Sequence, residues 1–204
     1  MNFREVYLIR HGATALNVEG GGPDRIRGWK NVPLSVHGRQ EVEQLSWQLA
    51  NSGLKTLCAS DMERARDTAK AVSKTTNAKV LTTPQLRPWN LGEFTGMESS
   101  SVHPEIVKYA VRKPNMRVPG GEAFNEFKER AFSGLRGAIR KVEKDYLGLV
   151  THHRVERLVK AWIAAGQTAD FDLDFDVMFQ RGEATAHAEI ISLNLDNLLA
   201  AEYL

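Results

Sequence analysis

Cysteine is nearly absent from this chain of 204 residues, because Cys58 is the only one. A single cysteine cannot form an intrachain disulfide, and it leaves no Cys-x-x-Cys pair for a metal site or a redox centre. Cys58 follows Leu57 in a predicted strand, so we expect a buried and unreactive thiol.

The sequence has no large excess of positive or negative charge and no long apolar stretch. Lys and Arg number 27 and Asp and Glu 25, and the net charge of +2 is too small to indicate a dedicated nucleic-acid-binding protein. Charged residues break each apolar run before the ~18 residues that a membrane span needs. Arg4 and Glu5 interrupt the N-terminus before the core of a signal peptide can form, so we expect a cytoplasmic protein that does not bind membranes.

What the chain does contain is an ordinary globular composition. Hydrophobic residues make up 42% of it, which suffices for a sizeable buried core, and the length favours one domain over residues 1–204. Clusters of β-branched and other apolar residues predict strands at residues 6–9, 54–59, 79–81, 147–151 and 187–193.

Predicted helices alternate with these strands. Ser35 is expected to cap a helix that ends near residues 51–53, and Ser60 to cap a second helix; later helices run through residues 124–135 and 154–165. Parallel strands need crossover connections, so this order predicts a three-layer α/β/α fold with a mostly parallel central sheet. A segment rich in Gly, Pro and Ser, at about residues 87–121, interrupts the alternation and is expected to form a small lid insertion.

Two histidines and two arginines follow the predicted strands. Arg10 and His11 follow the first strand, Arg64 lies one turn into the helix after the second, and His152 follows the fourth. Ligands of open α/β sheets bind beyond the carboxyl ends of the strands, so these side chains are expected at one rim. The alternative for Arg64 is a surface ion pair with an acid such as Asp61.

Further segments extend this pattern over most of the chain. They are Leu8-Ile9-Arg10-His11-Gly12 with Thr14 and Asn17, Gly28-Trp29, Pro33-Leu34-Ser35 with Gly38, Ser60-Asp61-Met62-Glu63-Arg64-Ala65 with Thr68-Ala69, Leu86-Arg87, Gly92-Glu93-Phe94 with Gly96, Pro119-Gly120-Gly121-Glu122, and Val150-Thr151-His152. Together they resemble the histidine phosphatase superfamily, also called the phosphoglycerate mutase-like fold.

The resemblance implies a phosphomonoester hydrolase that needs neither metal nor cofactor. His11 would attack phosphorus with an unprotonated ring nitrogen and form a phosphohistidine, while its other ring nitrogen donates to a carbonyl. Arg10 and Arg64 would hold the phosphoryl oxygens, Asn17 would add a neutral donor, and His152 would stabilise the transition state. These residue types are suited to those tasks.

The leaving-group acid is the one expected part that the sequence does not supply at its usual place. Many family members carry Glu where this chain has Pro88. Glu93 is our candidate for this acid, with Glu122 second and Glu183 third. His153 also departs from the family, which often has Gly there, and it would either narrow the pocket or add a donor.

Three other functions stay open alongside the hydrolase. One is a mutase of the same superfamily, and another is a phosphate-ester-binding module with little turnover, suggested by Pro88. The third and weakest is nucleic-acid binding, for which basic residues could surround the mouth of the site: Arg25, Arg27, Lys30, Arg87, Arg112, Lys113 and Arg117. We expect a small-molecule phosphate ester as the partner, with Trp29 and Trp89 either stacking on it or packing in the protein. The oligomeric state is not predicted.

Several polar residues are expected to be structural. The alternating acids of residues 170–176 could begin a calcium loop that ends at Glu183, but Val177 stands where such a loop needs Gly, so an edge strand or extended segment is favoured. His37 and His103 are assigned to the surface and His187 to a structural role.

Overall fold

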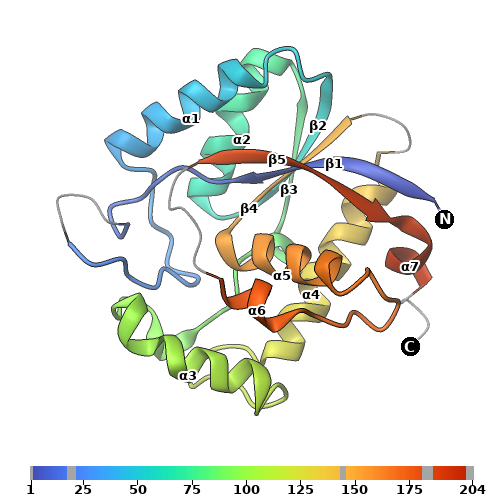
Figure 1. Cartoon of the computed structure of the whole chain (residues 1–204). Coiled ribbons are helices and arrows are strands. Elements are labelled where there is room, and N and C mark those ends of the chain that lie inside the picture. The colour runs from blue at the N-terminus through green and yellow to red at the C-terminus, as the bar shows by residue number, and fades with distance from the viewer. Residues whose placement is uncertain (1, 18–21, 143–145, 181–185, 201–204) are drawn as a thin grey trace.

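The computed structural model describes residues 2–17, 22–142, 146–180 and 186–200. Its centre is a five-stranded sheet in the order β3-β2-β4-β1-β5 (Figure 1). The strands are β1 (Phe3–Arg10), β2 (Leu54–Ser60), β3 (Lys79–Thr83), β4 (Tyr146–Thr151) and β5 (His187–Asn194). β1 to β4 run parallel, whereas β5 pairs antiparallel with β1. The predicted mostly parallel sheet is therefore confirmed.

Helices cover both faces of this sheet. α1 (Val36–Gln48) and α2 (Glu63–Thr76) pack on one face through Leu45, Ala65 and Ala69. α4 (Phe124–Arg140) and α5 (His153–Ala164) pack on the other face, in a core that includes Phe127 and Trp162 (Figure 1). The two cores share strands because successive residues of a strand point to opposite faces. Cys58 is buried between them, as expected.

Three further helices and two 3-10 turns complete the described part of the chain. They are η1 (Pro84–Leu86), η2 (Gly92–Phe94), α3 (Ser99–Val111), α6 (Phe175–Phe179) and α7 (Leu195–Ala200). Among the helices of the described residues, none is both long and apolar enough to cross a bilayer.

The two predicted serine caps have different outcomes. Ser35 caps α1 as expected, because its hydroxyl accepts from Gly38 N at 2.9 Å. The prediction for Ser60 is wrong: Met62 holds the N-cap position of α2, and Ser60 is the last residue of β2. Ser60 is thereby left at the carboxyl end of the sheet, where its side chain contacts a histidine described below.

Residues 170–176 do not form the expected edge strand. The chain is irregular up to Asp174, which caps the short helix α6 by accepting from Val177 N at 3.1 Å. Phe171 of this segment stacks on Phe132 of the core, whereas Phe175 is exposed. Within the described ranges, no group of three His, Cys, Asp or Glu could hold a metal ion; Glu183 lies outside those ranges.

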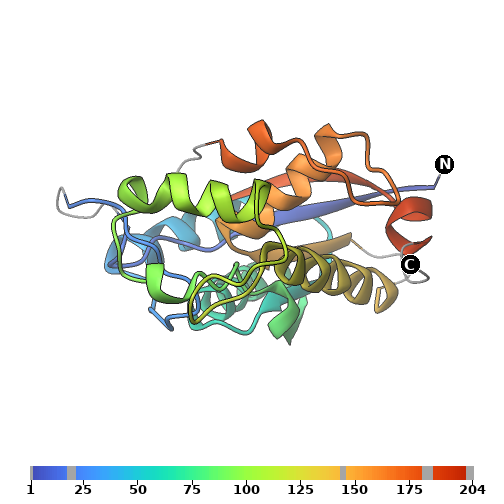
Figure 2. The same cartoon turned by 90° about the horizontal axis from the view of Figure 1, so that it is seen from below.

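The expected lid segment, residues 87–121, contains α3 and lies against the loop that precedes α1 (Figures 1 and 2). Ile26 N donates to Met97 O at 2.9 Å, and Gly96 N donates to Ile26 O at 2.8 Å. Arg25 and Glu98 form an antiparallel bridge next to this pair. The two segments therefore close one side of the sheet's carboxyl end together.

Candidate active site

The order of the sheet brings the predicted residues together. β1 and β2 both neighbour β4, and His11 N donates to Thr151 O at 3.2 Å across the ends of β1 and β4. Arg10, His11, Arg64 and His152 line one cavity of about 440 Å³. Their exposed fractions do not exceed 4%, so any group that they bind is largely removed from water.

The His11 ring is held in one tautomer. Its Nδ1 lies 2.7 Å from Gly12 O, and a carbonyl can only accept, so Nδ1 carries the hydrogen. Burial, and then the charge of Arg64, keep the pKa of His11 well below its usual range. His11 is therefore neutral near pH 7, with the lone pair on Nε2.

Two glycines fix the loop that carries His11. A Cβ at Gly12 would lie 2.5 Å from Gly38 O, and a Cβ at Gly38 would lie 2.0 Å from Ala13 O. Both distances are shorter than any real contact of a Cβ, so residues 11–14 rest directly on the first turn of α1. Gly12 N also donates to Thr68 Oγ1 of α2 at 3.3 Å.

His152 lies beside His11, with ring centroids 4.9 Å apart. Its Nε2 is 2.8 Å from Ser60 Oγ, and that oxygen accepts from Met62 N, so the Ser60 hydroxyl hydrogen is left for His152. When this hydroxyl donates to Nε2, the ring hydrogen of His152 is on Nδ1, which is buried and has no partner within the described part of the chain. Burial, followed by the charge of Arg64, also keeps the pKa of His152 well below its usual range.

Arg64 supplies a buried cation whose hydrogen bonds to protein go to carbonyls. Its Nη1 donates to Lys30 O at 3.0 Å and its Nη2 to Gly28 O at 3.1 Å. Burial, and then the charge of Arg27, lower the pKa of Arg64 to about 9. The expected alternative, an ion pair with Asp61, is wrong because Asp61 instead binds Arg87 through two bonds of 2.7 and 2.6 Å.

Arg10 and Asn17 complete the set predicted to hold phosphate. Arg10 Nη1 lies 3.3 Å from His153 Nδ1, and burial lowers the pKa of Arg10 to about 10. Asn17 Oδ1 accepts from Thr14 N at 2.8 Å, while its Nδ2 is buried without a partner in the described ranges. Asn17 does not itself line the cavity. Buried donors left without acceptors are costly, so the site favours an anion.

Two of the three candidate leaving-group acids, Glu93 and Glu122, do not line this cavity. Glu93 is exposed and is not among the lining residues, contrary to our expectation. Glu122 is bound by Arg130, and Glu183 lies outside the described residues. The carboxylates that do line the described cavity are Asp24 and Glu98, neither of which the sequence singled out.

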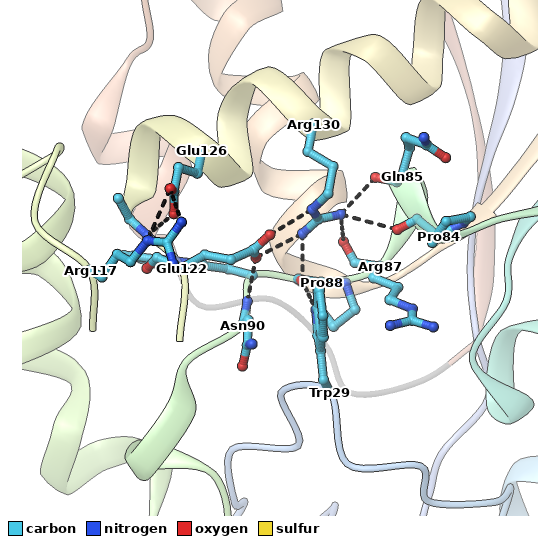
Figure 3. Close-up of polar contacts among 12 residues, drawn as sticks. Trp29, Pro84, Gln85, Arg87, Pro88, Asn90, Arg117, Glu122, Glu126 and Arg130 are labelled. Atoms are coloured by element: carbon cyan, nitrogen blue, oxygen red, sulfur yellow. Dashed lines mark hydrogen bonds and ion pairs between the residues drawn. The ribbon is translucent and has the colours of Figure 1, made fainter. Parts of the chain in front are cut away.

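Arg130 of α4 holds the segment that carries Pro88 (Figure 3). Its guanidinium donates to the carbonyls of Gln85, Arg87 and Pro88 at 2.8 to 3.1 Å, and Glu122 accepts two further bonds of 2.7 and 2.9 Å. Trp29 Nε1 also donates to Pro88 O, at 2.9 Å. Pro88 thus forms a fixed wall of the cavity.

Both tryptophans pack within the protein. Trp29 lies against Arg87, with the guanidinium carbon 4.8 Å from the ring centroid, and it does not line the cavity. Trp89 is fully buried and stacks on Phe127 in the core, although it also contributes to the cavity wall. Of the basic residues expected around the mouth, Arg27 lines the cavity.

The remaining histidines divide into surface, structural and cavity positions. His37 is exposed and pairs with Glu41, and His187 contacts Glu156 at 3.1 Å, as expected for a surface and a structural residue. The surface assignment of His103 is wrong, because His103 lines the cavity from α3. His153 also lines it and contacts Arg10.

Besides Asp24 and Glu98, the lining residues that the sequence interpretation missed include Arg154, Phe179 and Gln180. Arg154 could have been noticed because it directly follows the two histidines at the end of β4. Phe179 and Gln180 gave no such signal, since they reach the cavity only through the fold of residues 170–180.

Acidification should destabilise the folded protein through these buried histidines. Burial, and then the charge of Arg10, lower the pKa of His153 to about 2, and the pKa values of His11 and His152 are lowered as well. Unfolded histidines take up protons below about pH 6.5, so the free energy of unfolding should fall by up to about 1.4 kcal/mol per pH unit for each of them.

Urea unfolding measured between about pH 7.5 and pH 5.5 tests this expectation. His153→Asn should reduce the dependence on pH, because that variant has one proton fewer to take up on unfolding. A free energy of unfolding that is constant over this range would contradict neutral, buried imidazoles.

The fold and the cavity together define a class of protein. An open α/β sheet whose strand ends carry a neutral, buried histidine beside two buried arginines forms a cavity suited to an anion. The chain belongs to the histidine phosphatase superfamily, branch 1, whose family model matches residues 6–178. The resemblance seen in the sequence is thereby confirmed.

Individual relatives carry two kinds of name. A probable phosphoglycerate mutase, GpmB, of Escherichia fergusonii is 30% identical over 152 residues, which are 72% of this chain and 69% of the relative. The structure of a phosphoglycerate mutase from Thermus thermophilus is 29% identical with a TM-score of 0.59, and the match covers 78% and 84% of the two chains. A mycobacterial glucosyl-3-phosphoglycerate phosphatase has a TM-score of 0.71 over 94% of this chain and 91% of its own, but at 21% identity it shows the fold alone.

Proposed function

We propose that the protein is a phosphomonoester hydrolase that forms a phosphohistidine on His11 and needs no metal ion. The observation that supports this most strongly is the contact of 2.7 Å between His11 Nδ1 and Gly12 O, in a cavity that also holds Arg10 and Arg64. It leaves a lone pair on Nε2 next to two cations, which is the requirement for attack on a phosphoryl group.

In the first step, His11 Nε2 attacks phosphorus and forms the P–N bond while the ester P–O bond breaks. The alcohol leaves with a proton taken from solvent or from an acid at the cavity. In the second step, water attacks the phosphohistidine, the P–N bond breaks, and inorganic phosphate is released. His11 is neutral again at the end, with Nδ1–H still bonded to Gly12 O.

The other residues serve mainly by placing charge and hydrogen bonds around phosphorus. Arg10 and Arg64 offer planar groups of donors that match phosphoryl oxygens. His152 Nδ1–H, held by Ser60 through the opposite ring nitrogen, adds a neutral donor. Asn17 Nδ2 also lacks a partner in the described residues and would act from behind the cavity wall, because Asn17 does not line the cavity. A cavity of about 440 Å³ suits a small-molecule ester, since ligand sites typically measure roughly 300–1,000 Å³.

A mutase is the second candidate, and the names of the relatives from Escherichia fergusonii and Thermus thermophilus support it. A mutase keeps the phosphohistidine until the group returns to the product. Incubation with a phosphoglycerate and its bisphosphate separates the two: a hydrolase releases phosphate faster than it isomerises the substrate, and a mutase does the reverse.

The experiment for the proposed function combines trapping and chelation. The protein is incubated with p-nitrophenyl phosphate in the presence of EDTA, quenched, and analysed for protein-bound phosphate. We expect continued release of nitrophenol and a phosphate on His11 that is labile in acid and stable in base. Loss of all activity with EDTA would exclude the metal-free mechanism, and bound ester without turnover or phosphoenzyme would favour a binding module.

A further inference from the structure

We propose that the cavity has a second anion subsite, formed at α5 and α6 by Arg154 and Gln180, and that the substrate carries a second anionic group, a carboxylate or another phosphate. This inference rests on the proposed function, because it concerns the part of the ester that is not transferred. The subsite consists of the Arg154 guanidinium, the Phe179 ring beneath it and the Gln180 amide, opposite His103 of α3.

The position of the subsite follows from ring contacts between three helices. The guanidinium carbon of Arg154 lies 5.5 Å from the centroid of the Phe179 ring, and His103 packs edge to face on the same ring at 6.0 Å. Figure 1 places α6 between α5 and α3. The rings of His11 and His152 contact each other where β1 and β4 end, whereas Arg154 and His103 both contact Phe179 of α6. The subsite is thus built from other elements of the same cavity.

Arg154 differs from the other arginines of the cavity in what it binds. Arg27 pairs with Asp24 at 2.8 Å, Arg64 donates to two carbonyls, and Arg10 contacts His153. Arg154 has no hydrogen bond or ion pair with any residue that the structure describes, and only the ring of Phe179 supports it. A half-buried guanidinium without a protein acceptor can bind an anion through its paired donors.

The charged residues that line the described cavity also favour a second anion. Four arginines line it against two carboxylates, and the pKa values of His11, His152 and His153 keep those rings neutral. Asp24 is occupied by Arg27 and by Ser99 Oγ, which donates to it at 2.6 Å. With Arg27 paired to Asp24 and a phosphoryl group bound by Arg10 and Arg64, Arg154 and Glu98 are the charged side chains that remain in the described cavity, and no ion pair of the described residues joins them.

Gln180 provides a neutral donor next to Arg154. Its Oε1 accepts from Arg157 Nη1 at 3.2 Å, and because an arginine can only donate, the oxygen must be the atom that faces Arg157. The two hydrogens of the Gln180 amide nitrogen take no part in this bond, and Gln180 is an exposed residue that lines the cavity. A guanidinium and an amide nitrogen together make a set of donors without an acceptor, which selects an anion over a hydroxyl group.

The test uses matched pairs of esters. In the first series, phosphorylated ω-hydroxy acids of increasing chain length are each compared with the alkyl monophosphate of the same length, which has no second charged group. In the second series, α,ω-alkanediol bisphosphates are compared with the same alkyl monophosphates. We expect one chain length at which kcat/KM for the doubly anionic ester exceeds that of its partner by about 10-fold or more. The series that shows this preference tells whether the second group is a carboxylate or a phosphate.

Arg154→Gln should lower kcat/KM for that preferred ester by roughly 10- to 100-fold, mainly through KM, and lower it at most about threefold for the singly charged partner. Arg154→Lys should restore part of the preference because it keeps the charge. Arg112→Gln is the matched control, because it removes the same charge from an exposed arginine that lies at the end of α3, outside the cavity.

Two results would overturn the subsite: no preference in either series, or a preference that Arg154→Gln leaves unchanged. Hydrolysis of p-nitrophenyl phosphate by the wild type reports separately on the proposed function. If turnover is absent, calorimetric titration of the same pairs into the His11→Ala protein decides, because the expected difference in affinity does not require the reaction.

Discussion

Replacing His11 with alanine should lower kcat on any phosphate ester by roughly 10⁴-fold or more and leave no phosphoenzyme. The reason is that Nε2 of the neutral His11 ring carries a lone pair in the cavity that Arg10 and Arg64 also line. His152 cannot take over the attack through its own Nε2, because that atom is bonded to Ser60. Rapid quench with a radioactive phosphate ester, followed by acid and base treatment of the protein, measures both quantities.

His37→Ala is the matched control for this experiment, because His37 is an exposed histidine near the start of α1 that pairs with Glu41. It should keep normal turnover. A base-stable phosphate that persists in His11→Ala would reject His11 as the nucleophile and direct attention to another imidazole of the cavity, with His152 first.

Replacing Arg64 with alanine should lower kcat/KM by about 10²-fold or more, which is the usual loss for one donor that stabilises the transition state. Inorganic phosphate should raise the melting temperature of the wild type, since a ligand that binds the folded state stabilises it, and this increase should shrink in the variant. Steady-state kinetics and thermal unfolding with and without phosphate provide the two measurements.

Arg64 also holds the carbonyls of Gly28 and Lys30, so the alanine variant loses structural hydrogen bonds as well. Arg64→Lys separates the two effects, because it keeps a cation at the site without the planar pair of donors. Near-normal kcat/KM in a folded Arg64→Ala protein would remove Arg64 from the site.

The arrangement of Arg10, His11, Arg64 and His152 could be predicted because it depends on local rules. Each residue follows a strand whose apolar pattern is clear, and parallel strands necessarily end at the same edge. The wrong cap at Ser60 shows the limit of such rules. A serine at the end of a strand can bond to the next helix or to a neighbouring strand's residue, and only the packing of β2 beside β4 decides that it meets His152.

The parts of the cavity that were not predicted come from segments without a periodic pattern. The position of His103 depends on how residues 87–121 lie against residues 22–28, through backbone hydrogen bonds that any side chains could accompany. Residues 170–176 alternate like a strand, but the ring of Phe171 packs on Phe132 and Trp162 of the core instead. Tertiary contacts of this kind override local propensity.

The mutual contact of Gly12 and Gly38 has a consequence for how this protein can vary. A methyl group at position 38, on a helix that contributes nothing to the cavity, would push on Ala13 O and so on the residue that carries the reactive nitrogen. The first turn of α1 and residues 11–14 therefore behave as one rigid piece, and a substitution selected for the stability of that helix would also move the His11 ring. Changes in ligand preference are less constrained on the α3 and α6 side of the cavity, where the wall is made by side chains such as those of His103 and Phe179.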